Sequence, residues 1–273
     1  MMNTMKYLVV AMLAINGSSA LSGILLEETF ETGFSDDTLI NGINGWTGDS
    51  QLYSDSSSVP SHGTYAVRTV IAMLSSTGSK TFSAVVGGET DFYARQFIHF
   101  NGLNELSKWN MARFWISDGI GGLFGTGSAY LQAGYNKYAE SPDKWYVTIN
   151  YWYKDAAETD EVNGSKRFWY DPSLNNGLSG AIDAPIGSRN DVWYEIQITY
   201  DTAAKTVSWD IREEDGTWIN IDTHTSASTT WTPARININT GNNLVTSTAV
   251  ACLDDILVRQ GPVPAAGTVI VIH

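Results

Sequence analysis

Apolar and polar residues alternate with a period of two over long parts of this chain. In the stretch 191–211, DVWYEIQITYDTAAKTVSWDI, two such runs flank the polar loop 201–205. A period of two places successive side chains on opposite faces of a β-strand, whereas a helix needs a period of 3.6. A short polar loop between two such runs is typical of a hairpin. The stretch therefore predicts a hairpin whose buried face is formed by Val192, Tyr194, Ile196, Ile198, Tyr200, Val207, Trp209 and Ile211.

The rest of the chain repeats this pattern in short segments separated by Gly, Asn, Asp, Ser and Pro. We find no long segment with the i, i+3, i+4 apolar spacing of an amphipathic helix. Aromatic residues make up 12% of the chain and charged residues only 16%, a balance that favours strands and turns over helices. Many short strands at this spacing indicate an all-β sandwich or barrel, and we expect a two-sheet antiparallel β-sandwich.

Three segments are expected along the chain. Residues 1–20 contain Lys6, then an apolar run, then small residues that end at Ala20, which is the pattern of a secretory signal peptide. No linker interrupts residues 21–260, so we expect one domain there. Residues 261–273 contain two prolines and a short apolar tail, and we expect a disordered C-terminal extension. Neither apolar run is long enough to span a bilayer, so a secreted or cell-envelope protein is predicted.

Composition and motifs disfavour several classes of function. The formal net charge of −13 argues against nucleic acid as a partner, because phosphate binding needs clustered Lys and Arg. The four histidines are scattered and have no zinc spacing. Neither a Gly-x-Ser-x-Gly elbow nor a phosphate-binding loop occurs. The single cysteine, Cys252, allows no intrachain disulfide and is expected to be a small buried hydrophobe, so the core or a bound ion must stabilise the fold.

Three stretches, EETFETGF near the start, FYARQFIHF in the first third and ACLDDILV near the end, carry a resemblance to a known fold. In this order, and together with the hairpin, they resemble the concanavalin A-like lectin and glucanase jelly rolls of exported bacterial proteins, laminin-G-like domains included. The resemblance implies two antiparallel sheets packed face to face, with the first and last strands as neighbours. It also implies that a glycan binds on the concave face of the front sheet.

Two kinds of enzyme are alternatives for that face. A retaining glucanase needs acids on one strand as Glu-x-Asp-x-Glu, and the nearest match, AETDEVNG, has its last acid one residue too early and reads as a loop. A polysaccharide lyase needs a base and a group that neutralises a uronate. Arg95 and His99 alternate onto one face of their strand, and YLQAGYNKY, with Tyr135, is loosely similar to a strand of alginate lyases. Arg95, His99 and Tyr135 are therefore the candidate lyase residues, with a plain structural role as the alternative.

The same three residues, together with Trp152 and Trp169, form the predicted carbohydrate-binding set. Aromatic rings can stack on the apolar C–H faces of sugars, although most aromatic residues of such a sandwich belong to the core. We expect a carbohydrate-binding protein that recognises a polysaccharide or glycoconjugate. The alternatives are a lyase or hydrolase on the same concave face, and a structural or adhesive surface protein.

A calcium site is also implied by the resemblance, because smaller sandwich modules with the FETG and LDDI motifs often hold a structural ion between their terminal strands. The candidate ligands are Glu31, Asp254 and Asp255, which offer the carboxylate oxygens that a hard cation prefers. Since successive strand residues face opposite ways, only one of the two aspartates should point at the ion. The alternative is that all three are solvated charges at the edge of a sheet.

Overall fold

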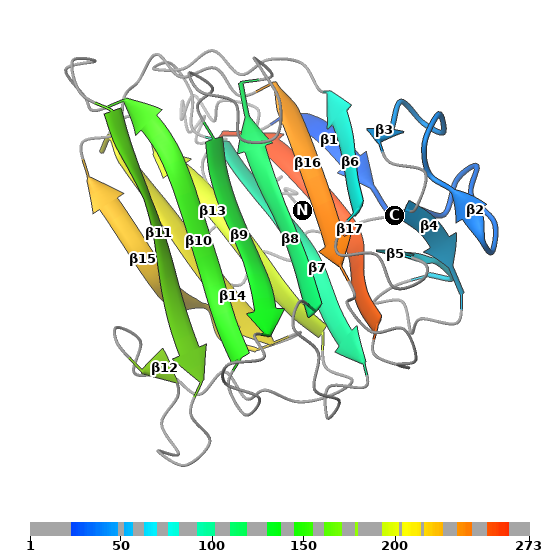
Figure 1. The fold of residues 1–273 in the computed structure, drawn as a ribbon. Helices are drawn as coiled ribbons and strands as arrows, with labels where there is room; N and C mark the ends of the chain where they lie inside the picture. The colour runs from blue at the N-terminus through cyan, green and yellow to red at the C-terminus, as the bar shows by residue number, and fades with distance from the viewer. Residues whose placement is uncertain are drawn as a thin grey trace, which may run out of the picture.

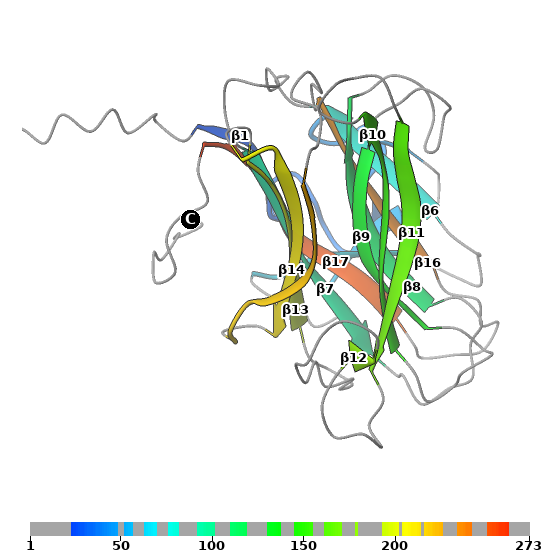
Figure 2. The same cartoon turned by 90° about the vertical axis from the view of Figure 1, so that its left-hand side faces the viewer.

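The computed structural model contains two antiparallel β-sheets packed face to face, with no helix among the residues it describes (Figures 1 and 2). The described residues are 23–48, 52–56, 63–69, 76–81, 92–101, 110–118, 130–137, 145–154, 161–170, 178–179, 193–201, 204–213, 216–225, 234–241 and 250–261. The prediction of an all-β, two-sheet antiparallel sandwich is confirmed.

The first sheet has nine strands, in the order β15-β14-β13-β7-β17-β5-β4-β2, with β1 paired to β17. Their bounds are β1 (Ile24–Glu28), β2 (Thr38–Leu39), β4 (Leu52–Asp55), β5 (Ala66–Thr69), β7 (Phe92–Asn101), β13 (Trp193–Asp201), β14 (Thr206–Glu213), β15 (Ile219–Thr225) and β17 (Val250–Gln260).

The second sheet has eight strands, in the order β12-β11-β10-β9-β8-β16-β6-β3, and lies in front in Figure 1. Their bounds are β3 (Thr47–Gly48), β6 (Ser76–Thr81), β8 (Asn110–Ser117), β9 (Tyr130–Lys137), β10 (Trp145–Lys154), β11 (Glu161–Tyr170), β12 (Leu178–Ser179) and β16 (Arg235–Gly241). Strand β11 starts at Glu161, so the acidic stretch that reads as a loop already enters a strand at its third acid.

The first and last strands of the sandwich are neighbours, as the resemblance implies. Strand β1 pairs antiparallel with β17, with Leu26 opposite Val258 and Glu28 opposite Ile256. Phe30, just after β1, and Ile256 belong to the same buried apolar cluster. The first and last strands therefore meet in the interior of the first sheet, where β17 lies between β7 and β5.

The hairpin formed by β13 and β14 has the predicted buried face, apart from Val192, which lies outside the described residues. Ile196 lies opposite Ile211, Ile198 opposite Trp209, and Tyr200 opposite Val207, and all six side chains are buried. Asp201 lies opposite Thr206, and the backbone N–H of Ala204 donates to Oδ1 of Asp201 at 2.8 Å. Because the inner face lies in the core, the alternate residues of both strands face away from the second sheet. We call this side of β13, β14 and β15 the outer face.

Candidate functional site

The predicted carbohydrate-binding residues are divided between the two sheets. Arg95 and His99 lie in β7 of the first sheet, whereas Tyr135, Trp152 and Trp169 lie in β9, β10 and β11 of the second. Their backbone positions are described, but their side chains lie outside the described part of the structure. The structure thus brings Arg95 and His99 into one layer and does not bring the other three to that layer.

Backbone register places Arg95 and His99 at positions that match the outer face. Arg95 is paired with Gln197 and His99 with Trp193, and both partners alternate with the core residue Ile196. The outer face of β13 and β14 therefore continues across the backbone of β7. The resemblance implies a glycan site on a concave sheet face, and in Figure 2 this side of β13 and β14 is the concave one.

The carboxylates of Glu31 and Asp254, two of the three predicted calcium ligands, accept hydrogen bonds from the backbone. Oε1 of Glu31 accepts hydrogen bonds from the backbone N–H groups of Thr64 and Tyr65, at 2.7 and 2.8 Å. Asp254 is fully buried, and its Oδ1 accepts from the backbone N–H of Asp255 at 2.9 Å. No group of three or more His, Cys, Asp or Glu side chains that could hold a metal occurs within the described ranges.

Strand β17 is irregular at these two aspartates. Asp255 has a φ of 50°, and the register with β7 shifts between Asp254 and Leu257. A bulge with a left-handed residue interrupts the alternation of faces, so the expectation that one aspartate points each way does not apply here. Both aspartates are in fact buried, at 0% and 2% exposure.

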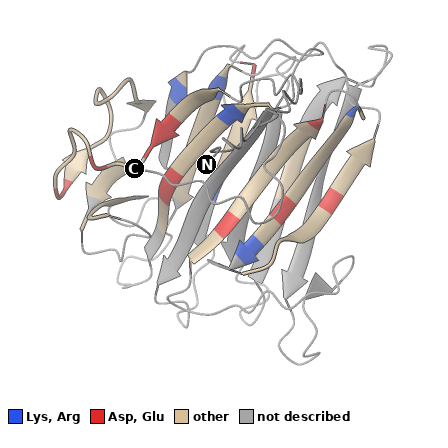
Figure 3. Ribbon diagram, turned by 180° about the vertical axis from the view of Figure 1, so that it is seen from behind, with Lys and Arg blue, Asp and Glu red and all other residues tan. Residues whose placement is uncertain are grey.

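The outer face carries polar and aromatic side chains of β13, β14 and the start of β15. Glu195 and Gln197 are buried, so β13 is buried on both faces and not on one face as the alternation predicts. In Figure 2, β13 and β14 bow towards the second sheet, which makes this face the hollow side of the first sheet. Figure 3, which views the sheet from that side, shows acidic positions on several neighbouring strands. We use the name outer-face cluster for seven of these side chains, which are Glu195, Gln197, Ser208, Asp210, Arg212, Trp218 and Asn220.

One part of the outer-face cluster is an ion pair beneath a ring. Glu195 lies opposite Arg212 in the hairpin register. Nε of Arg212 donates to Oε2 of Glu195, and Nη2 forms an ion pair with the same oxygen. The Glu195 side chain is fully buried, whereas that of Arg212 is 26% exposed. The guanidinium carbon lies 4.5 Å from the centroid of the Trp218 ring, within the range of a cation–π contact. The pair is charge-neutral and fixes the position of Trp218.

The other part of the cluster is the carboxylate of Asp210. Nδ2 of Asn220 donates to its Oδ1 at 2.9 Å, and Oγ of Ser208 donates to its Oδ2 at 3.3 Å. Burial raises the pKa of Asp210 above its ordinary value, although both hydrogen bonds act to lower it. The folded protein therefore binds this proton more readily than the unfolded chain, so Asp210 makes stability fall as the pH rises through the interval between the two pKa values.

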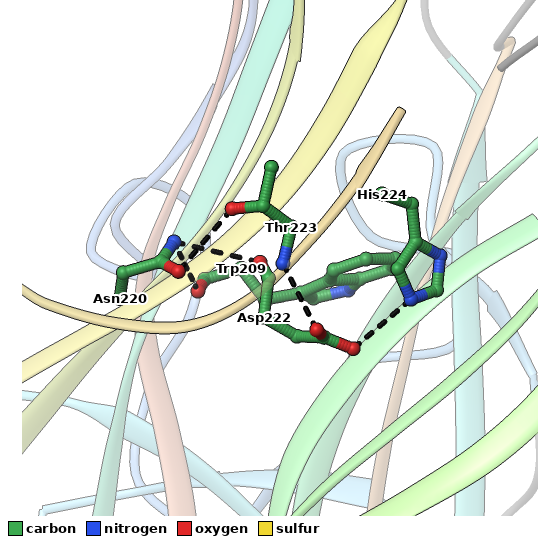
Figure 4. A network of polar contacts seen from close by, with 5 residues as sticks. All are labelled: Trp209, Asn220, Asp222, Thr223 and His224. Atoms are coloured by element: carbon green, nitrogen blue, oxygen red, sulfur yellow. Dashed lines mark hydrogen bonds and ion pairs between the residues drawn. The ribbon is translucent and has the colours of Figure 1, made fainter. Parts of the chain in front are cut away.

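Asn220 connects this carboxylate to an irregular part of β15. The register between β14 and β15 shifts between Trp209 and Asp210, and Nδ2 of Asn220 also donates to the backbone carbonyls of Trp209 and Asp222, both at 3.4 Å. Oγ1 of Thr223 donates to Oδ1 of Asn220 at 3.2 Å (Figure 4). These contacts hold the amide of Asn220 in place beside Asp210.

A second polar pair lies on the inner side of β15 and joins the two sheets. Nε2 of His224 lies 3.0 Å from Oδ2 of Asp222 (Figure 4). The His224 ring also packs edge-on against Tyr151 of β10, at a centroid distance of 4.3 Å, and against Trp209 of β14, at 5.0 Å. Since Tyr151 belongs to the second sheet, this pair is part of the packing between the layers and not of the outer face.

Comparisons with known proteins bear on the fold. No protein-family model matches the chain, and no curated protein matches its sequence. Basic winged bean lectin, solved with Tn-antigen, is 10% identical, covers 86% of this chain and 97% of its own, and has a TM-score of 0.51. Winged bean acidic lectin, solved with methyl-α-D-galactose, is 9% identical over 86% and 98%, with a TM-score of 0.50. The chain has a concanavalin A-like fold. The CBM2 module of the evolved Dit protein of Lactobacillus casei BL23 phage J-1 is also similar, at 10% identity over 87% and 95%, with a TM-score of 0.51.

The concanavalin A-like fold that the resemblance implies is confirmed, but the outer-face cluster is not among the predicted site residues. The sequence does show Glu195 and Gln197 on the polar side of β13, and Asp210 and Arg212 on the polar side of β14. Once Asp201 is placed opposite Thr206, the register brings Glu195 to Arg212 and Gln197 to Asp210. The missing signal was therefore the pairing of two strands and not the pattern of either strand.

Proposed function

We propose that this concanavalin A-like protein binds a polysaccharide or glycoconjugate on the outer face of β13, β14 and β15. Glycans offer hydroxyl groups for hydrogen bonds and apolar C–H faces for aromatic rings. The observation that carries the proposal is that the half-buried ring of Trp218 and the partly exposed carboxylate of Asp210 lie on one hollow sheet face, each held by its own contacts.

Binding is favoured over hydrolysis by the state of the two outer-face carboxylates. A glycoside hydrolase needs two carboxyl groups that flank the glycosidic bond. Glu195 is fully buried and engaged with Arg212, so only Asp210 of this pair can meet a ligand. A lyase built on Arg95, His99 and Tyr135 would draw on both layers, since Tyr135 lies in the second sheet.

A glycan array, combined with a test for unsaturated products, distinguishes the three functions. We expect binding of at least one glycan without release of product. Growth of ultraviolet absorbance on anionic polysaccharides would instead support the lyase alternative. Failure to bind every glycan on the array would support a structural or adhesive surface protein.

Calcium at Glu31, Asp254 and Asp255 remains a proposal that the resemblance supports. The described contacts do not form a three-carboxylate group, and Glu31 already holds residues 64 and 65. If calcium bridges the terminal strands, addition of a chelator is expected to lower the melting temperature, because the ion binds the folded state alone. An unchanged melting temperature would contradict the calcium site. In that case, the variant Glu31→Gln, in which the two backbone contacts are weaker, measures how much Glu31 stabilises the fold in the absence of an ion.

The place where the protein acts is likewise a proposal. The pattern of residues 1–20 supports export through a signal peptide, and a glycan outside the cell or in the envelope would then be the partner. No helix in the described segments has the length and hydrophobicity needed to cross a membrane. Identification of the first residue of the protein recovered from its source would test cleavage near Ala20.

A further inference from the structure

The charges around Asp210 restrict the kind of glycan that the outer face can hold, provided that the proposed function is correct. Arg212 is the only Lys or Arg side chain that the structure describes in the outer-face cluster, and two of its nitrogens already contact Glu195. Recognition of a uronate or sulfate group needs an Arg or Lys that is available to form charge-assisted hydrogen bonds. Within the described cluster, no cation is left to perform that task, and Arg95, the next cation on this face by backbone register, lies two strands away from Asp210.

The carboxylate of Asp210 favours ligands that donate hydrogen bonds. An ionised carboxylate accepts hydrogen bonds through about four lone-pair sites and donates none. In this structure, Ser208 and Asn220 each supply one hydrogen bond to it, so further acceptor capacity remains. Sugar hydroxyl groups can use that capacity, whereas an anionic group would meet the carboxylate with a like charge.

Trp218 and Asp210 are spaced so that one sugar ring can contact both. Asp210 and Arg212 are two residues apart on one face of β14, which is about 7 Å along a strand. The Trp218 ring sits on Arg212, and Asn220, two residues further along the chain, sits on Asp210. A sugar ring against Trp218 would therefore have its hydroxyl groups within reach of Asp210.

We propose that the outer-face cluster binds an uncharged glycan, with Trp218 against the face of a sugar ring and Asp210 as the acceptor of its hydroxyl hydrogen bonds. Anionic polymers such as polyuronates are then poor ligands. The lyase alternative, which requires a uronate, is disfavoured at the same site.

Binding should also depend on the ionisation of Asp210. Its neighbours on β14 are Ser208 and Arg212, it faces Gln197 on β13 and Asn220 on β15, and Glu195 is held by Arg212. Asp222 and His224 of β15 lie on the inner side, and Arg95 of β7 lies one strand further along by backbone register. Since protonation converts one oxygen of Asp210 into a donor, affinity should fall as the pH is lowered through its pKa, which burial raises.

The test uses neutral hexasaccharides of glucose, mannose, xylose and galactose, with hexagalacturonate and a hexameric alginate as anionic probes. Binding is measured by isothermal titration to the wild type, Asp210→Asn, Trp218→Ala and the control Glu27→Gln. Glu27→Gln also removes one negative charge, at an exposed position of β1. The fold is expected to tolerate Asp210→Asn, because the fold already disfavours the ionised carboxylate.

We expect at least one neutral hexasaccharide to bind and both anionic probes to bind more weakly by a factor of about ten or more. Asp210→Asn and Trp218→Ala should each weaken binding by about tenfold or more, which is the usual effect of losing a hydrogen bond to a charged acceptor or a stacked ring. Glu27→Gln should bind as the wild type does, and Asp210→Asn should lose the dependence of affinity on acidic pH.

Tighter binding of either anionic probe would overturn this inference and leave the proposed function intact. Binding of a neutral probe that neither Asp210→Asn nor Trp218→Ala weakens would also overturn it, because the ligand would then lie elsewhere. Failure of the probes and of a full glycan array to bind would overturn the proposed function itself.

Discussion

Replacement of Glu28 by alanine is expected to lower the free energy of unfolding by about 3–5 kcal/mol. The Glu28 side chain is 6% exposed, and Nζ of Lys80 lies 2.7 Å from its Oε2. Nε1 of Trp46 donates to the same oxygen at 3.0 Å, and the backbone N–H of Phe30 donates to Oε1 at 3.1 Å. Removal of the carboxylate leaves the largely buried Lys80 ammonium and two buried donors without this acceptor, which is costlier than the loss of an exposed ion pair.

The position of Glu28 and Lys80 between the two sheets increases the expected loss of stability in Glu28→Ala. Glu28 belongs to β1 of the first sheet and Lys80 to β6 of the second, so the pair joins the two layers. Phe30 has a φ of 56°, a left-handed value that is unfavourable for a side chain of this size, and the contact from Glu28 supports it. Guanidinium unfolding of Glu28→Ala and of the neighbouring control Glu27→Ala measures the difference. Similar midpoints for the two variants would contradict this role of Glu28.

Replacement of Trp209 by alanine is expected to lower the free energy of unfolding by about 3–5 kcal/mol, through the cavity that the lost ring leaves. Trp209 is fully buried, and its ring lies 5.8 Å from that of Tyr151 in the second sheet and 5.0 Å from that of His224. The same substitution at Trp218 removes a half-buried ring from the outer face, so it should cost much less stability.

The two tryptophan variants are expected to differ in opposite ways in an unfolding assay and in a glycan-binding assay. Trp209→Ala should lower the unfolding midpoint strongly, while Trp218→Ala should weaken glycan binding and leave the midpoint close to that of the wild type. Trp209→Phe retains an aromatic ring and should fall between Trp209→Ala and the wild type. Equal loss of stability in Trp209→Ala and Trp218→Ala would show that the outer face is as much a part of the core as the inner one.

The sequence predicts the strands well wherever they alternate over six or more residues. The hairpin of β13 and β14 and the neighbouring positions of β1 and β17 are confirmed, and Cys252 is buried as expected. The short strands β2, β3 and β4 lie in or beside a polar stretch and were not predicted. Two of them have only two residues, and pairing with a partner strand determines them more than their own composition does.

The site was harder to predict because it is built across strands. Residue types within single segments suggest Arg95, His99 and Tyr135, and these residues fall in two different layers. The contact between Glu195 and Arg212 depends on the register of a hairpin, and that between Asn220 and Asp210 depends on an irregularity between β14 and β15. The alternation within each strand predicts the Glu195–Arg212 contact only after the turn has been placed. It does not predict the Asn220–Asp210 contact.

Hydrogen–deuterium exchange with and without a bound neutral hexasaccharide locates the binding face. We expect protection on binding to be concentrated in residues 206–213 and 216–223, which contain Asp210, Trp218 and Asn220. Protection confined to the second sheet, in β8 to β11, or to the segment 31–48, with no change in β14 and β15, would contradict this expectation.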